Sequence, residues 1–111
     1  MNRTELGRSG EARAAAYLEG MGYRVVERNA RFPGGEIDLI CQDGLTLVFV
    51  EVKARSGQGF GPAISAVDQR KRRKIRSMAS DYAQFHAPSA RLRFDVVTID
   101  GEIIALHRGA F

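Results

Sequence analysis

The sequence predicts a single α/β domain, spanning residues 1–111, in which two helices flank a mixed β-sheet. Two segments, 4–20 and 63–86, carry apolar residues at helical spacing. Five short segments have the composition of strands, and Asp-Gly pairs at 43–44 and 100–101 mark hairpin turns. The expected order is therefore helix, three strands, helix and two strands, which one hydrophobic core can hold together in a chain of 111 residues.

The first predicted helix covers residues 4–20, with Thr4 suited to cap its first turn and Gly20 suited to end it. Residues 23–32 predict the first strand, which the Pro-Gly-Gly sequence at 33–35 ends. The inward-facing stripe of the helix should consist of small and apolar residues, namely Leu6, Gly10, Ala14, Tyr17, Leu18 and Met21.

The second and third strands are predicted over residues 35–41 and 45–54. The third strand is apolar on both faces, which is typical of a central strand. Leu47 and Phe49 would lie on one face, and the other face would carry Val48, Val50 and Val52.

In the second half of the chain, the glycine-containing segment 55–63 predicts a loop, and residues 63–86 predict a helix. Residues 91–100 and 102–108 predict the last two strands. Because a helix connects the third and fourth strands, these two should pair in parallel within an otherwise antiparallel sheet. The inward-facing residues of the second helix should be Ile64, Val67, Ile75, Met78, Ala79 and Tyr82.

Three charged residues interrupt the apolar second and third strands. If residues 43–44 form the turn, Asp38 lies opposite Phe49 and becomes a diagonal neighbour of Glu51. The two carboxylates would then be about 7–8 Å apart at the backbone, and Lys53 would share their face.

Two converging carboxylates in an apolar strand pair repel each other, and a divalent cation resolves this conflict. Carboxylate ligands favour Mg²⁺ or Mn²⁺, and Lys53 would help to orient a water and offset charge on a phosphate. Glu11 borders the apolar face of the first helix and points to the same site. Simpler roles stay open: Lys53 could pair with Glu51 or Asp38, Glu11 could be an exposed helix charge, and Glu36 could be a rim residue or a further ligand.

Six basic side chains are concentrated in residues 70–76 of a chain with a formal net charge of +4 and a pI of about 9.7. They favour a phosphate-binding face, with a merely solvated helix surface as the alternative. The segment 57–61 is either a substrate flap or a connector, and Asp95 either enters the site or pairs with an arginine such as Arg93. The basic residues are Arg70, Lys71, Arg72, Arg73, Lys74 and Arg76.

The helix-one carboxylate, Asp38 in the second strand and the Glu-Val-Lys sequence at 51–53 resemble the PD-(D/E)xK nuclease superfamily. Their order is similar to that of its archaeal Holliday-junction-resolvase branch. Across nearly the whole chain, GRSGEARAAAYLEGMGYRVVERNARFPGGEIDLI and LVFVEVKARS closely resemble the bacterial YraN family. Ile37 departs from the superfamily name, which expects proline there. The resemblance implies a restriction-endonuclease-like core.

The superfamily resemblance also implies roles for individual residues. Asp38 and Glu51 would bind the metal, the Val52 carbonyl would assist them, and Lys53 would be catalytic. Glu11 matches the helix-one carboxylate of the resolvases. The residues expected to contact nucleic acid are Gln69, Arg55 and the basic residues of the second helix.

These features predict a metal-dependent nuclease that hydrolyses phosphodiesters in DNA, including branched or otherwise structured DNA. The alternatives are a non-catalytic nucleic-acid-binding module with the same fold and a protein-interaction scaffold. A junction resolvase would need two sites and hence a homodimer. The single cysteine, Cys41, and the lack of a secretory signal or a membrane-length apolar run predict a cytoplasmic protein that does not bind membranes.

Overall fold

The computed structural model describes residues 3–55 and 68–111 of the chain. The predicted flap or connector at 57–61 and the predicted inward residues Ile64 and Val67 lie outside the described residues. The order of helices and strands agrees with the prediction. The elements are α1 (Arg3–Gly20), β1 (Arg24–Phe32), β2 (Gly35–Asp43), β3 (Thr46–Arg55), α2 (Gln69–His86), β4 (Arg91–Asp100) and β5 (Ile103–His107).

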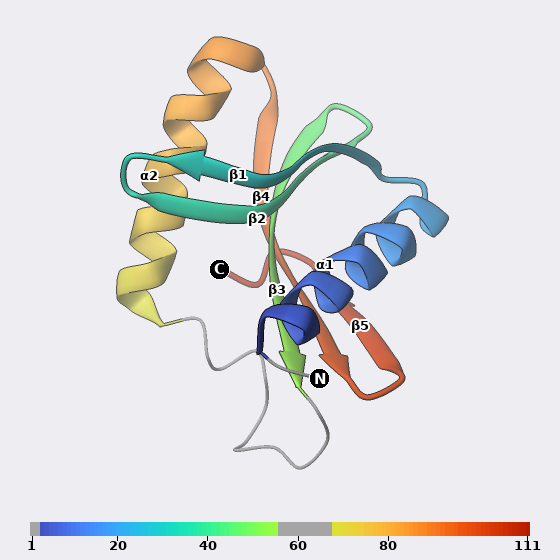
Figure 1. Ribbon diagram of the computed structural model, residues 1–111. Helices are drawn as coiled ribbons and strands as arrows, with labels where there is room; N and C mark the ends of the chain where they lie inside the picture. The colour runs from blue at the N-terminus through green and yellow to red at the C-terminus, as the bar shows by residue number, and fades with distance from the viewer. Residues whose placement is uncertain (1–2, 56–67) are drawn as a thin grey trace.

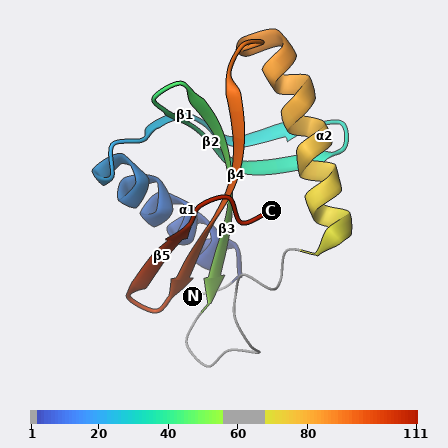
Figure 2. The same cartoon turned by 180° about the vertical axis from the view of Figure 1, so that it is seen from behind.

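The five strands form one sheet in the order β1-β2-β3-β4-β5. β3 and β4 pair in parallel and the other neighbouring strands pair antiparallel, which confirms the predicted mixed sheet. β3 is the middle strand, and this position explains why its residues are apolar on both faces. α1 and α2 cover opposite faces of the sheet, and each packs on its own hydrophobic cluster (Figures 1 and 2).

β2 bends in its middle, so that its first half runs across the direction of β3 (Figure 1). The second half pairs with β3, and this ladder ends at the pair Leu39–Val50. The first half turns toward α2 together with β1. In consequence Ile37 packs with the α2-side cluster, whereas Leu39 packs with the α1-side cluster.

The predicted register of the β2–β3 hairpin is wrong by two residues. Asp43 pairs with Thr46, so Gly44 and Leu45 form the two-residue turn. Gly44 has a φ of 62° and is the turn residue with positive φ, an arrangement that suits glycine at the first central position of a type II′ turn. The predicted turn would have required a positive φ at Asp43 as well. Because the shift is even, the side chains in the paired part of the hairpin keep their predicted faces.

α1 packs closely on the sheet because its contact stripe is built from small residues. Gly10 lies so near β3 that a β-carbon there would stand 3.0 Å from the Ala54 side chain. Ala14 and Leu18 of the predicted stripe are fully buried. Met21, also predicted to face inward, is 44% exposed because it follows the end of the helix at Gly20.

α2 begins after Asp68, whose carboxylate caps the helix by accepting the Lys71 backbone N–H at 2.8 Å. The predicted inward residues in the described part of this helix are all buried, namely Ile75, Met78, Ala79 and Tyr82. They pack on β-sheet aromatics such as Phe49, whose ring meets that of Tyr82 edge-on at 6.1 Å. Among the residues that the structure describes, no helix is both long and apolar enough to span a membrane.

Candidate functional site

The site is built where β2 departs from β3. Beyond the last ladder pair, the Val52 N–H has lost a backbone partner on β2 and donates instead to Oδ2 of Asp38 at 2.8 Å. The Asp38 side chain therefore takes over the role of a backbone acceptor. This bond aims the carboxylate at the central strand and fixes its position. The Val52 contribution is thus an amide donor, and the role implied for its carbonyl stays a prediction.

Asp38 and Glu51 converge, as predicted, although they lie one residue beyond the last ladder pair, Leu39–Val50, and not at diagonal positions within the ladder. Burial, followed by the adjacent Glu51 carboxylate, raises the pKa of Asp38 to about 7. The Glu51 side chain is only 6% exposed. Its Oε2 atom is buried without a hydrogen-bond partner among the described residues, which is costly for a carboxylate oxygen.

Lys71, and not Lys53, forms the ion pair with Glu51. Its Nζ donates to Glu51 Oε1 at 3.0 Å. Burial opposes the charge of Lys71, but its contacts with Lys53 and Glu51 outweigh that effect and raise its pKa. Burial and then the neighbouring Lys71 ammonium lower the pKa of Lys53. The two lysines therefore flank Glu51 with unequal basicity, and Lys53 is the one more easily deprotonated.

A second group of acids adjoins this pair. Glu11, Glu36 and Asp38 can each offer a carboxylate oxygen within 4.8 Å of the others. Burial, followed by the Asp38 charge, raises the pKa of Glu11, while a hydrogen bond with Asn29 opposes the shift. Glu11 thus reaches the site from α1 as predicted. Glu36 is exposed but belongs to the same cluster.

Asn29 is a site residue that the sequence reasoning missed. It has a φ of 52° and lies in β1 between the pairs Arg28–Leu39 and Ala30–Ile37, which places it opposite Asp38. An asparagine in the middle of a strand was the available signal, since asparagine tolerates the left-handed region better than most residues.

The predicted basic face of α2 is divided around the helix. Lys71 turns toward Glu51, and Arg76 lies over the Phe94 ring at 4.8 Å. Arg72 is half-buried and makes contacts of its own. The remaining predicted residues of the helix are exposed, namely Gln69, Arg70, Arg73 and Lys74. Arg55 ends β3, and its side chain lies outside the description.

An open pocket of about 310 Å³ lies between Glu36 of the acidic cluster and α2. Its lining combines Glu36 of the acidic group with Arg70, Lys71 and Lys74 of the helix. Gly34 and Gly35 of the β1–β2 turn form the opposite wall, close to Met78. Glu36 of the acidic group is therefore approached from a surface that carries positive charge, a suitable approach for an anion.

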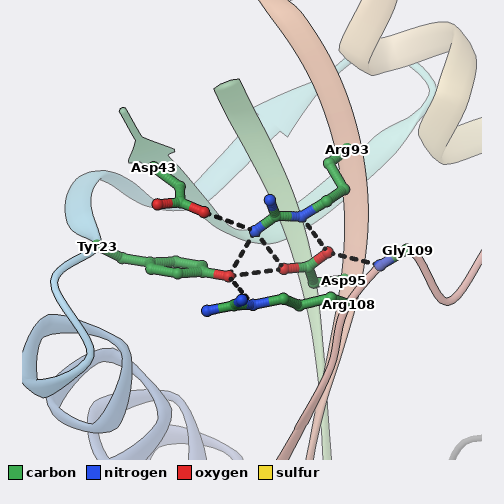
Figure 3. A network of polar contacts seen from close by, with 6 residues as sticks. All are labelled: Tyr23, Asp43, Arg93, Asp95, Arg108 and Gly109. Carbon is green, nitrogen blue, oxygen red and sulfur yellow. Dashed lines mark hydrogen bonds and ion pairs between the residues drawn. The ribbon is translucent and has the colours of Figure 1, made fainter. Parts of the chain in front are cut away.

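Asp95 does not enter this site. It is fully buried on the α1 side of the sheet and pairs with Arg93, Nε to Oδ1 at 3.0 Å, which was the simpler of the two expectations. The Tyr23 hydroxyl and the Gly109 N–H also donate to it (Figure 3). This buried acid therefore has its hydrogen bonds satisfied, in contrast to Glu51.

The Asp95 network joins segments that are distant in sequence. Arg93 also reaches Asp43 at the β2–β3 hairpin, at 3.1 Å, and Arg108 donates to the Tyr23 hydroxyl from beyond β5 (Figure 3). These bonds tie the end of α1, the hairpin and the C-terminal segment to β4. We interpret the network as structural, because both Asp95 oxygens and the Tyr23 hydroxyl are hydrogen-bonded within it.

Taken as a class, the molecule is a mixed-sheet α/β domain with an acidic site at a strand departure and a cationic helix beside it. The chain belongs to the family described as "Uncharacterised protein family UPF0102", whose model matches residues 10–99, and this confirms the YraN-like family resemblance.

Several UPF0102 proteins are similar to the chain along most of their length. One from Dechloromonas aromatica is 51% identical over 108 residues, which cover 97% of this chain and 89% of the relative. One from Shewanella loihica is 45% identical over 105 residues, covering 95% and 92%. One from Chlorobium chlorochromatii is 48% identical over 103 residues, covering 93% and 78%.

Proposed function

We propose that the protein is a metal-dependent nuclease that hydrolyses phosphodiester bonds in DNA. One observation carries the proposal: the buried Glu51 carboxylate has an oxygen with no hydrogen-bond partner among the described residues, and it lies beside Asp38, whose pKa is raised to about 7. An apolar strand pair has no structural need for two such groups. The free-energy cost of burying the two carboxylates is explained if a cation and a substrate phosphate complete the site.

The donor set suits Mg²⁺ or Mn²⁺, because both prefer carboxylate oxygens and keep waters in their coordination. Asp38 and Glu51 would hold the ion, with Glu11 and Glu36 close enough to contribute directly or through water. When bound, the ion would supply Lewis-acid activation of the phosphate and of a water. Asp38 keeps its position through the Val52 N–H, so the site is partly organised before binding.

The two lysines have different tasks in this proposal. Lys71 partly neutralises Glu51 and would be displaced toward the phosphate when the ion takes over that carboxylate. Lys53, with its lowered pKa, is suited to orient the attacking water and to stabilise charge that develops on the phosphate. The likeness of Asp38, Glu51 and Lys53 to the PD-(D/E)xK pattern supports the same assignment.

DNA is the proposed partner because the exposed cations of α2, among them Arg70 and Lys74, line a pocket beside Glu36 of the acidic cluster. Branched or otherwise structured DNA fits the resolvase-like order of the motif, and cutting both strands of a junction would call for a homodimer. The proposed location is the cytoplasm. The second candidate is a non-catalytic nucleic-acid-binding module, which the same cationic approach favours.

The test is a cleavage assay on a panel of linear, single-stranded, flapped and branched DNA, with Mg²⁺ and Mn²⁺ in turn. Glu51→Gln should abolish cleavage, and Lys53→Met should slow it by about 10²–10³-fold, the usual loss for one such electrostatic group. DNA affinity should change much less in both variants. Cleavage that is equal in wild type and both variants would come from a contaminant, and binding without cleavage would favour the non-catalytic module.

A further inference from the structure

The distal half of α2 carries an aromatic pocket that the proposed chemistry does not use. It is an open hollow of about 400 Å³ between the helix and the β1–β2 turn. Phe32, Tyr82, Phe85 and His86 line it, and the rings of Tyr82 and His86 are stacked at 4.2 Å. Phe85 is 85% exposed, which is unusual for so large an apolar side chain and needs a reason.

This aromatic pocket is continuous with the cationic pocket beside the carboxylates. Gly34, Lys74 and Met78 line both hollows, so one surface runs along α2 from Lys71 to Phe85. At 1.5 Å per residue, the helical rise from Lys71 to Tyr82 is about 16 Å. A few nucleotides of one strand span such a distance, with their phosphates near the cations at one end and a base at the aromatic end.

We propose that the aromatic pocket binds an unpaired nucleobase of the strand whose phosphate lies at Asp38 and Glu51. The proposal rests on the proposed function and specifies its substrate: nucleic acid with a single-stranded segment next to the cut. Successive cations followed by exposed aromatic rings are the combination by which proteins hold single strands. A base within a duplex is covered on both faces by its neighbours, so a paired base cannot enter the pocket.

The charges around the pocket favour a base over a phosphate at its distal end. Three cations outnumber the two acids Glu36 and Asp68 in the lining of the cationic pocket, whereas in the aromatic pocket the exposed carboxylate of Asp81 offsets Lys74, so a phosphate is attracted less there. The same carboxylate can accept a hydrogen bond from an amino group on the edge of a base. Lys74, which lines both pockets, is placed to hold the phosphate between them.

The test measures stacking and affinity in metal-free buffer at one fixed salt concentration, so that the strand stays intact. Two probes are compared: a single-stranded oligothymidylate that contains one 2-aminopurine, and the same strand annealed to its complement. The fluorescence of 2-aminopurine falls when this base stacks on a ring. We expect quenching with the single strand only. Phe85→Ala should remove the quenching and weaken single-strand binding by about tenfold or more, because one stacking partner is lost. The affinity for the duplex should change by less than about twofold.

Two further variants serve as controls. Phe85→Tyr retains a ring and should retain the quenching. Ile103→Ala removes an apolar side chain that is 73% exposed on β5, away from the pocket, and should change nothing. Because Phe85 is largely exposed, its replacement should leave the fold intact.

The outcomes separate this inference from the function on which it rests. If Phe85→Ala binds the single strand as tightly as wild type does, or loses single-strand and duplex binding equally, the aromatic pocket does not hold a base. The pocket would then be a surface for an apolar segment of a protein partner, while cleavage that depends on Glu51 would still support the nuclease. If instead Glu51→Gln cuts like wild type, the nuclease proposal fails, although base stacking at Phe85 would stand.

Discussion

Replacing Asp38 by asparagine should stabilise the protein at neutral and alkaline pH in the absence of metal. Asparagine keeps an acceptor for the Val52 N–H but removes the charge facing Glu51. The pKa of Asp38 rises from 3.8 to about 7 on folding, a change of roughly three units. Each unit corresponds to about 1.4 kcal/mol, so the upper limit of the effect is about 4 kcal/mol.

The sign follows from proton linkage. The folded protein holds the Asp38 proton more tightly than the unfolded chain does, so this group contributes full stability below pH 3.8. That contribution is lost as the pH rises through about 7. The difference in unfolding free energy between Asp38→Asn and wild type should therefore be small near pH 4. It should increase by up to about 1.4 kcal/mol per pH unit and level off above pH 7.

The assay is urea denaturation of both proteins from pH 4 to pH 8 with a chelator present. The exposed Asp81→Asn on α2 is the matched control and should differ from wild type by no more than about 0.5 kcal/mol at any pH. A variant that is less stable than wild type at pH 8 would refute the reasoning. Asp38 would then be a stabilising partner of a structural ion pair, and the argument for a cation at this site would lose its basis.

Two further predictions concern ligands. Mg²⁺ or Mn²⁺ at 100 times its dissociation constant should stabilise wild type by about 2.7 kcal/mol in a thermal-shift measurement. Glu51→Gln should lose this effect, and NaCl of equal ionic strength should not stabilise wild type. Equal stabilisation of both proteins by the divalent ion would place the ion elsewhere. Removing Arg70 and Lys74 together should reduce the slope of log K against log salt for duplex DNA by up to about two units. Arg91→Ala, an exposed change at the start of β4, is the control, and an unchanged slope in the double variant would move the DNA contact to another surface.

Much of the architecture was predictable because it depends on local patterns. The alternation in β3 and in the second half of β2 predicted their faces, and the helical spacing of Ile75, Met78 and Tyr82 predicted the buried side of α2. The parallel pairing of β3 with β4 followed from the helix between them. The convergence of Asp38 and Glu51 was predicted correctly even though the hairpin register was not, because an even shift preserves the faces within the ladder and both residues lie one position beyond its last pair.

Other features depend on contacts between distant segments, which periodicity does not encode. The Lys71–Glu51 ion pair exists because the first turn of α2 lies beside β3, and Lys71 was indistinguishable in sequence from its basic neighbours. Asn29 joined the site through its position opposite Asp38. The aromatic pocket is lined by Phe32 of β1 and Phe85 of α2, and β2 and β3 lie between these two elements in the sequence.

The sequence by itself determined the elements, their order, the mixed sheet and the set of acids that share a face, since these follow from the side-chain periods of 3.6 and 2 and from short turns. Only the tertiary structure decided how the acids are held and what surrounds them. β2 bends away from β3 after Leu39, and this frees the Val52 N–H to position Asp38. The bend also brings the β1–β2 turn against α2 and forms the two joined pockets there. Its cause is packing of the β1–β2 hairpin, with Ile37, against the buried face of α2, a contact between segments far apart in the chain.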